Sequence, residues 1–398
     1  MYMKDQHRKV FIEEKFRNLF GEKPDIWVQA PGRVDLMGSH TDYNLGYVLI
    51  QTINRSTWIA ASPRTDGKIR IASLNLAGRA EFELSRIEHD TQIPWSNYVR
   101  GVAHVLLEEN YPLTGFDGLV HSTIPFGSGL SSSAALEVAT IEVFETLSNW
   151  RIEALQKALF CQRAENQFVG MQCGIMDQYA SVMGRAGCIL LLDCRSITSE
   201  IKPVAPGLQV VICDTRAERA LTGSEYSQRR AQCEAGAALL ADYYPGIQSL
   251  RDVSLDQLQA HQADMDPVIY KRCYFILQEN QRVLDTAAAL VTGRHAEAGR
   301  LAVESFNGAR DLYEIVSQEM LCMFDAIMHA PGVFGARGAG AGFGGCLVAF
   351  VGDDCVDAFM DYVQHQYAHS TGIQAEIYPV RALDGAGVLN IEQDSNDE

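Results

Sequence analysis

Residues 125–135 read Pro-Phe-Gly-Ser-Gly-Leu-Ser-Ser-Ser-Ala-Ala and lie between two segments of different periodicity. Residues 118–124 before this loop are a short apolar run typical of a strand, whereas residues 134–147 after it have helical spacing of apolar side chains. Glycines let backbone N–H groups approach an anion closely, and the start of a helix adds unpaired donors. The loop therefore predicts either a phosphate-binding site or a plain turn with a serine N-cap.

Two common nucleotide-binding sequences are excluded for this loop. It has no Lys in the GK[ST] arrangement of a P-loop, and its glycines lack the GxGxxG spacing of dinucleotide-binding folds. Its serine hydroxyls could donate to phosphate, and one of them could ligate Mg²⁺. The residues of the loop alone leave both interpretations open.

The surrounding sequence predicts an α+β fold with two lobes. The first part of the chain is rich in expected strands, and helical spacing dominates from residue 267 to about 328. Expected strands are residues 26–30, 47–50, 57–61, 69–72, 80–84, 118–124, 208–213 and 346–351. Expected helices before the C-terminal part are residues 98–109, 134–147 and 153–168. We place the division near residue 200, which gives an N-terminal domain of residues 1–200 and a C-terminal domain of residues 201–398.

Composition and charge argue against some classes of binding partner. The 398 residues include 33 Lys or Arg and 50 Asp or Glu, for a net charge of −17. This acidic balance argues against nucleic acid and anionic membranes, which need clustered Lys and Arg. No signal peptide is expected, and no window approaches the roughly 18 apolar residues of a membrane span. The 10 cysteines form no CxxC pair, and with no HExxH motif a zinc site has little support. We expect a monomer with reduced thiols in the cytoplasm.

Further motifs indicate a family. Residues 30–44, Ala-Pro-Gly-Arg-Val-Asp-Leu-Met-Gly-Ser-His-Thr-Asp-Tyr-Asn, resemble the galactokinase signature, and residues 125–135 resemble the second motif of the GHMP kinases. Gly-Ile-Met-Asp-Gln at 174–178 and Gly-Phe-Gly-Gly-Cys at 342–346 are similar to further motifs of this family. The resemblance runs from about residue 20 to 390. It implies a two-lobed GHMP kinase fold, with a β-rich N-terminal lobe that carries the loop, a C-terminal α+β lobe and the active site between them.

The resemblance also implies an activity and its residues. It implies ATP- and Mg²⁺-dependent phosphorylation of the anomeric hydroxyl of D-galactose, with Asp177 as the candidate base and Arg33 paired to it. Ser133 and Glu165 would hold Mg²⁺, with Ser132 as the alternative hydroxyl ligand. The implied sugar-binding residues are Ser39, His40, Thr41, Asp42, Gly174 and Tyr226. The implied nucleotide-binding residues are Ser73, Gly127, Ser128, Gly129, Leu130, Ser131, Ser132 and Ser133, with Trp95 less secure.

The chain departs from the galactokinase pattern where the sugar would bind. It has Ser39 where the family has a Glu that contacts the 6-hydroxyl of the sugar, and Asp35 where the family has Asn. Gly338-Ala339 replaces Met-Thr, and residues 216–219 are atypical. A hydrogen bond to a charged group is worth about 1.5–3 kcal/mol, so its loss would weaken a sugar roughly ten- to a hundredfold.

Three functions therefore remain in view. D-Galactose is the default substrate, and L-arabinose or galacturonate is the alternative for the same reaction. A non-catalytic sugar- and ATP-binding regulator is a second class, but sensors that resemble galactokinase have lost part of Ser-Ser-Ser-Ala, which is complete here at residues 131–134. If Ser39 reports on the sugar's C6 group, Ser39→Glu should raise kcat/KM for galactose about tenfold.

Overall fold

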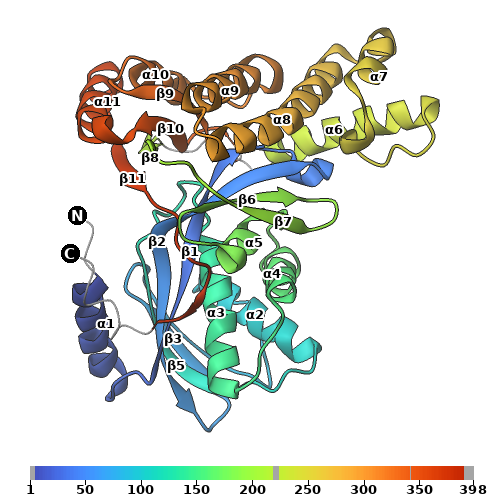
Figure 1. The fold of residues 1–398 in the computed structure, drawn as a ribbon. Helices are drawn as coiled ribbons and strands as arrows, with labels where there is room; N and C mark the ends of the chain where they lie inside the picture. Colours follow the sequence, from blue (N-terminus) through green and yellow to red (C-terminus); the bar gives the residue numbers. More distant parts are fainter. Residues whose placement is uncertain (1–4, 218–223, 341, 390–398) are drawn as a thin grey trace.

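The glycine-rich loop joins β5 (Gly115–Ser122) to α3 (Ser132–Ser148) in a computed structural model of the chain, which describes residues 5–217, 224–340 and 342–389 (Figure 1). β5 belongs to a large sheet with the strand order β12-β1-β2-β5-β3-β4, and β6 and β7 extend it from β2. The pairing of β3 with β5 is parallel, and the other pairings in this sheet are antiparallel. The loop therefore starts at the end of a central strand.

Long strands and buried helices build this first lobe. Its strands are β1 (Ile26–Met37), β2 (Tyr47–Arg64), β3 (Lys68–Ser73), β4 (Arg79–Glu83), β5, β6 (Cys188–Asp193), β7 (Thr198–Pro203) and β12 (Gly387–Val388). Its helices are α1 (Asp5–Phe20), α2 (Ser96–Glu108), α3, α4 (Ala154–Arg163) and α5 (Met176–Met183). α3 is buried along most of its length because its apolar side chains and alanines pack between the sheet and α2. α1 covers the opposite face through Ile12 and Phe16 (Figure 1).

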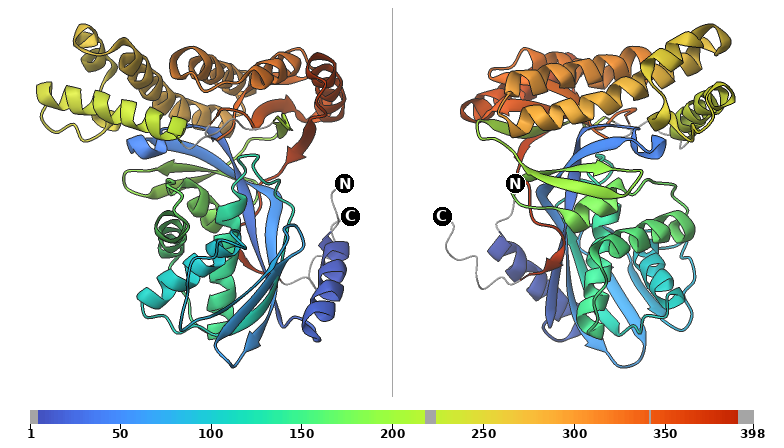
Figure 2. Two further views of the ribbon diagram at one scale, coloured as in Figure 1. Left: turned by 180° about the vertical axis from the view of Figure 1, so that it is seen from behind. Right: turned by 45° about the vertical axis from the view of Figure 1, so that its right-hand side comes forward.

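A second sheet, with the order β11-β8-β10-β9, forms the other lobe above the first (Figures 1 and 2). Its strands are β8 (Leu208–Asp214), β9 (Val333–Gly338), β10 (Cys346–Gly352) and β11 (Glu376–Val380). Its helices are α6 (Ser224–Tyr243), α7 (Leu255–Ala260), α8 (Pro267–Val291), α9 (His295–Gly308), α10 (Gln318–Met328) and α11 (Val356–Thr371). α10 and α11 bury apolar side chains against β8 and β10, while α6 and α8 share a separate apolar cluster.

The chain crosses between the sheets at two places. The passage from β7 to β8 lies at residues 204–207, and β12 returns from the second lobe to pair with β1. The division into residues 1–200 and 201–398 stays a prediction, and this return of the C-terminal segment is a feature that it did not include. The connection of β1 to β2 also reaches α8, where the Tyr47 N–H donates to Asn280 Oδ1 at 2.7 Å.

The expected mixed α and β content is confirmed, but three of the expected segments differ, and α1, β9 and β11 were not predicted. The expected strands 47–50 and 57–61 are one strand, β2, because the polar residues between them still pair with β1, as in Thr52 opposite Arg33. The expected helix 153–168 is α4 followed by a π-helical turn, Ala164–Val169. The expected helical region 267–328 is divided into α8, α9, a π-helical turn and α10.

Candidate active site

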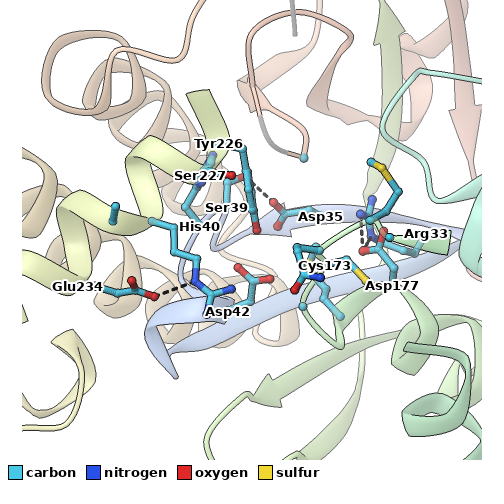
Figure 3. Close-up of a pocket in the computed structure, with 18 residues that line it drawn as sticks. Arg33, Asp35, Ser39, His40, Asp42, Cys173, Asp177, Tyr226, Ser227 and Glu234 are labelled. Atoms are coloured by element: carbon cyan, nitrogen blue, oxygen red, sulfur yellow. Dashed lines mark hydrogen bonds and ion pairs between the residues drawn. The ribbon is translucent and has the colours of Figure 1, made fainter. Parts of the chain in front are cut away.

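A cavity of about 670 Å³ lies where the two lobes meet. Its wall combines the end of β1 and the following turn with the segment before α5, the first turns of α6 and Gly340 (Figure 3). Figure 3 shows the side chains of Arg33, Asp42, Asp177 and Tyr226 around this space. Elements from both lobes are therefore needed to form the cavity.

Arg33 and Asp177 form a fixed pair at one end of the cavity. Arg33 Nε and Nη2 donate to Asp177 Oδ1 at 2.9 and 2.5 Å, and Arg33 Nη1 donates to the Gly129 carbonyl at 2.6 Å. Ser131 Oγ donates to Asp177 Oδ2 at 2.5 Å. Asp177 lies in the first turn of α5 and Arg33 on β1. Arg33 and Asp177, which were expected to pair, are thus both bonded to the glycine-rich loop.

The glycine-rich loop has a backbone that exposes N–H groups rather than a serine-capped turn. Gly127, Gly129 and Ser131 have positive φ values of 71°, 85° and 62°. Ser131 occupies the N-cap of α3, but its side chain makes no capping bond because it donates to Asp177. The first turn of α3 thus keeps free backbone donors, as anion binding at a helix N-terminus requires.

The side chains of two expected loop residues are directed into the protein itself. Ser128 Oγ donates to the Pro125 carbonyl at 2.8 Å, and the Leu130 side chain is buried. Gly32 allows the loop to approach β1, since a Cβ there would lie 2.7 Å from the Leu130 carbonyl oxygen. None of the expected nucleotide-side residues is part of the cavity wall, and two of them, Ser73 and Trp95, make contacts away from the loop. Ser73 Oγ accepts from the backbone N–H groups of residues 75 and 76, and Trp95 Nε1 donates to the carbonyl of residue 77.

Oxygen donors suited to Mg²⁺ gather beside the start of α3. Glu165, from the π-helical turn, is buried. Burial raises the pKa of Glu165, and the charge of Asp177 adds to this effect, whereas the nearby Ser133 side chain acts to lower its pKa. Gln178 Nε2 donates to Glu165 Oε2 at 2.6 Å and to Glu137 Oε2 at 3.0 Å.

Glu137 was not predicted from the sequence. Burial raises its pKa well above the ordinary range, and nearby Glu165 raises it further. Among the described residues, no three His, Cys, Asp or Glu side chains are placed to hold a metal ion together. A carboxylate and a hydroxyl beside a phosphate loop nevertheless fit Mg²⁺, which uses few protein ligands and takes others from phosphates.

The expected sugar-binding residues occupy the other end of the cavity. Asp42 and Gly174 are in close contact, since a Cβ on Gly174 would lie 2.2 Å from Asp42 Oδ2. Burial raises the pKa of Asp42 to about 6, and the charges of Asp177 and Asp35 act in the same direction. The His40 and Tyr226 rings also line this end, with their centroids 5.4 Å apart.

Thr41 is the expected sugar-side residue that does not line the cavity. It is fully buried, and its hydroxyl lies 2.6 Å from both the Gly38 and the Tyr47 carbonyl oxygens. Thr41 thus stabilises the turn that presents its neighbours. Of the other atypical positions, Ala339 is buried and donates its N–H to the Cys346 carbonyl at 2.9 Å, while Glu218 and Arg219 lie outside the described residues.

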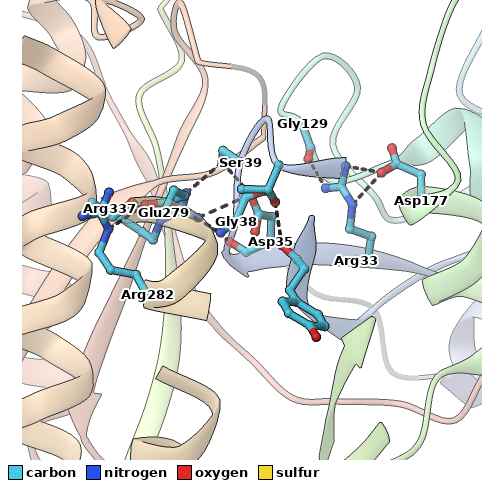
Figure 4. A network of polar contacts seen from close by, with 12 residues as sticks. Arg33, Asp35, Gly38, Ser39, Gly129, Asp177, Glu279, Arg282 and Arg337 are labelled. Atoms are coloured by element: carbon cyan, nitrogen blue, oxygen red, sulfur yellow. Dashed lines mark hydrogen bonds and ion pairs between the residues drawn. The ribbon is translucent and has the colours of Figure 1, made fainter. Parts of the chain in front are cut away.

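Ser39 lines the cavity and belongs to a polar network that spans the two lobes (Figure 4). Ser39 Oγ donates to Asp35 Oδ2 at 2.5 Å and accepts from Arg337 Nη2 at 2.8 Å. Arg337, on β9, also lies 3.2 Å from Glu279 Oε1 of α8. Arg337 and Glu279 were not predicted, because no local pattern marks them. Arg337 is 298 residues from Ser39, and Glu279 is 241 residues from Gly38.

Comparison with known proteins covers most of the chain. The model for the GHMP kinases N terminal domain matches residues 97–185, the galactokinase galactose-binding signature matches residues 14–63, and the GHMP kinases C terminal model matches residues 286–369. A galactokinase from Roseiflexus sp. is 43% identical over 376 residues, which are 94% of this chain and 96% of that protein. A galactokinase from Chloroflexus aurantiacus is 41% identical over 94% of this chain and 95% of its own length.

Solved structures give the same relationship. The structure of Lactococcus lactis galactokinase complexed with galactose has a TM-score of 0.91 and 34% identity, and the match covers 96% of this chain and 99% of that one. Mevalonate kinase from Methanococcus jannaschii has a TM-score of 0.65 at 16% identity, over 90% of this chain and 98% of its own, and shares the fold.

In the part of the chain that the structure describes, no helix is long and apolar enough to cross a membrane.

Proposed function

This chain belongs to the galactokinase family of the GHMP kinases, and from that membership we propose that it phosphorylates D-galactose at the anomeric hydroxyl with ATP. The products are galactose 1-phosphate and ADP. The observation that carries the proposal is the arrangement of Arg33, which donates to Asp177 and to the Gly129 carbonyl of the loop. One side chain thereby connects the candidate base to the candidate phosphate cradle.

Phosphoryl transfer depends mainly on positioning and on stabilisation of charge. In the proposed reaction, the anomeric oxygen forms a bond to the γ-phosphorus, the bond to the leaving ADP oxygen breaks, and Asp177 accepts the proton. Arg33 places a fixed guanidinium beside Asp177 and the glycine-rich loop, where the γ-phosphate is expected. The backbone N–H groups around Gly127, Gly129 and the start of α3 bind the phosphates.

Residues of the first lobe would also hold the metal ion, and residues of both lobes would hold the sugar. Ser133 and Glu165 would hold Mg²⁺, which supplies positive charge to the phosphates when bound. The effect of the Ser133 side chain on the pKa of Glu165 puts the two side chains near each other and favours Ser133 over Ser132 as the hydroxyl ligand. We assign sugar hydroxyl contacts to the side chains of His40, Asp42 and Tyr226 and to the Gly174 backbone, which share one end of the cavity.

The alternative substrates and the non-catalytic alternative would need different contacts in the cavity. A C6 carboxylate, as in galacturonate, would meet Asp35 and Asp42, both of which line the cavity. L-Arabinose, which has no C6, remains the second candidate because Ser39 is short. A regulator without activity would not need the Arg33–Asp177–Ser131 contacts, which are all present. We place the enzyme in the cytoplasm as a monomer, where its 10 cysteines, which form no disulfide in the structure, would stay reduced.

A coupled ADP-release assay tests the proposed function. The purified protein is given ATP, Mg²⁺ and one free sugar at a time, including D-galactose, L-arabinose and D-galacturonate. We expect galactose to give the highest kcat/KM, and ¹H and ³¹P NMR of the product to show phosphate on the anomeric carbon. A higher kcat/KM for L-arabinose would make the second candidate correct. ADP release that no sugar stimulates would contradict a sugar kinase altogether.

A further inference from the structure

Asp35 and Ser39 form a hydrogen-bonded pair on the cavity wall. Both residues line the cavity, and the Asp35 side chain is completely buried (Figure 3). The single hydroxyl proton of Ser39 is donated to Asp35 Oδ2 at 2.5 Å. Ser39 therefore has no proton left to donate to a ligand, and the charged acceptor of this pair is the Asp35 carboxylate.

Arg337 fixes this pair from the second lobe. Its Nη2 donates to Ser39 Oγ at 2.8 Å, and its Nη1 donates to the Asp35 carbonyl at 3.2 Å and lies 3.4 Å from Asp35 Oδ2. Arg337 also contacts Glu279, which in turn pairs with Arg282 at 2.8 Å. Two guanidiniums and two carboxylates thus face one another, and of the two carboxylates only Asp35 lines the cavity (Figure 4).

One oxygen of the Asp35 carboxylate accepts no hydrogen bond from the described residues. Asp35 Oδ1 has no hydrogen-bond partner among the described residues, although the side chain is buried. Buried carboxylate oxygens are nearly always hydrogen-bonded, because an unsatisfied one is destabilising. Ser39 and Arg337 occupy the other oxygen, and the cavity that Asp35 lines is the space from which a ligand could supply a donor for Oδ1. A sugar hydroxyl is such a donor.

We propose that Asp35 is a sugar-binding, specificity-determining residue that accepts a hydrogen bond from a hydroxyl of the monosaccharide, with Ser39 and Arg337 as its positioning residues. The inference rests on the proposed function for the identity of the ligand. It gives the two departures from the galactokinase signature one explanation: the carboxylate that the family places at position 39 is supplied here from position 35.

This proposal reverses an expectation drawn from the sequence. Ser39→Glu was expected to improve galactose turnover, but the structure places the Ser39 hydroxyl oxygen 2.5 Å from the Asp35 carboxylate. A glutamate there would lie against a second carboxylate in a buried site. We now expect Ser39→Glu alone to weaken galactose, and Asp35→Asn combined with Ser39→Glu to recover most of the loss.

The first experiment measures galactose Kd by calorimetry, independently of phosphoryl transfer, and kcat/KM in parallel. Asp35→Asn should raise Kd about ten- to a hundredfold, the size of one charged hydrogen bond. Asp117→Asn is the matched control, because Asp117, on β5, is a buried carboxylate that pairs with Arg64 and Arg70 and does not line the cavity. It should lower stability and leave Kd unchanged.

The second experiment identifies the hydroxyl. Wild type and Asp35→Asn are each titrated with 2-, 3-, 4- and 6-deoxy-D-galactose. For the analogue that lacks the bonded hydroxyl, wild type should lose affinity and Asp35→Asn should lose little more, so the two changes are not additive. Additive losses for all four analogues would overturn the proposal, since a purely structural role of Asp35 has no preferred hydroxyl.

Ser39→Glu, alone and combined with Asp35→Asn, gives a test that does not require the single variant Asp35→Asn to fold. Tighter galactose binding by Ser39→Glu alone would overturn the proposal, and weaker binding that the double variant restores would support it. The proposed function can fail separately: wild type that binds galactose without releasing ADP is no kinase, but its Kd values still test Asp35. Wild type that binds no monosaccharide overturns both.

Discussion

Asp177 is hydrogen-bonded at both carboxylate oxygens, and most of these bonds do not require its negative charge. Arg33 donates twice to Oδ1 and Ser131 donates to Oδ2, so an asparagine can keep most of these contacts. We expect Asp177→Asn to lower kcat at least about a hundredfold, in the range of a lost proton acceptor, and to leave ATP affinity within about threefold. ADP-release kinetics and calorimetry with ATP measure the two effects. A kcat near that of wild type would remove Asp177 from the mechanism.

Asp42 makes stability depend on pH in a direction that can be checked. Its pKa is raised from 3.8 to about 6, chiefly by burial. Its neutral form therefore stabilises the fold below pH 3.8, and this contribution is lost as the pH rises through about 6. Asp42→Asn lacks this loss. Relative to wild type, its free energy of unfolding should gain up to about 3 kcal/mol between pH 4 and 7.5, measured by urea unfolding. An unchanged difference would show that Asp42 does not titrate in this interval.

At the scale of elements, the segment before α5 contains Gly174. This position requires glycine because a larger residue would not fit beside Asp42, and not because of a positive φ. A Cβ on Gly174 would lie 2.2 Å from Asp42 Oδ2, so Gly174→Ala must displace that carboxylate. We expect KM for galactose to rise about tenfold or more while KM for ATP stays within about twofold. Gly387→Ala in β12, where nothing lies within 4 Å of the added atom, is the control. Equal effects on both substrates would contradict the assignment of this segment to the sugar.

Single elements were predicted well where their signal is local. The strand, glycine-rich loop and helix from residue 115 to 148 follow from periodicity and glycine placement, and the structure confirms them. β2 was predicted as two strands because residues 51–56 are mostly polar, and their pairing with β1 is a tertiary effect. The π-helical turn that carries Glu165 was likewise not predicted, since its sequence continues the helical pattern of α4. Local patterns do not encode which neighbour a polar segment will meet.

At the scale of the whole molecule, the site depends on contacts between the two lobes, and no sequence motif predicts these contacts. Arg33, Asp177 and the loop could be predicted because the family motifs contain them. Arg337 and Glu279 could not, because each becomes part of the site only when β9 and α8 meet the β1–β2 turn of the first lobe. The departure at Ser39 was visible in the sequence, but its meaning depends on Asp35 and Arg337 beside it.

Glu279 is the central residue of this contact between lobes. It is completely buried in α8, accepts from the Gly38 N–H at 3.2 Å and from Ser305 Oγ at 2.8 Å, and faces Arg282 and Arg337. Burial opposes its ionisation, but the two guanidiniums prevail and hold its pKa below the ordinary value of 4.5. Removing one partner of a buried ion pair typically costs about 3–5 kcal/mol, because the other charge is left uncompensated.

Glu279→Gln should therefore lower the free energy of unfolding by about 3–5 kcal/mol at pH 7, measured by urea unfolding. A lowered pKa stabilises the fold above pH 4.5, and this contribution is lost as the pH falls through the folded-state value. The difference between wild type and Glu279→Gln should therefore shrink below pH 4.5. Glu83→Gln, at an exposed pair with Lys68, is the control and should cost less than about 1 kcal/mol. A difference that stays constant down to acid pH would mean that Glu279 acts through shape and hydrogen bonds rather than through its charge.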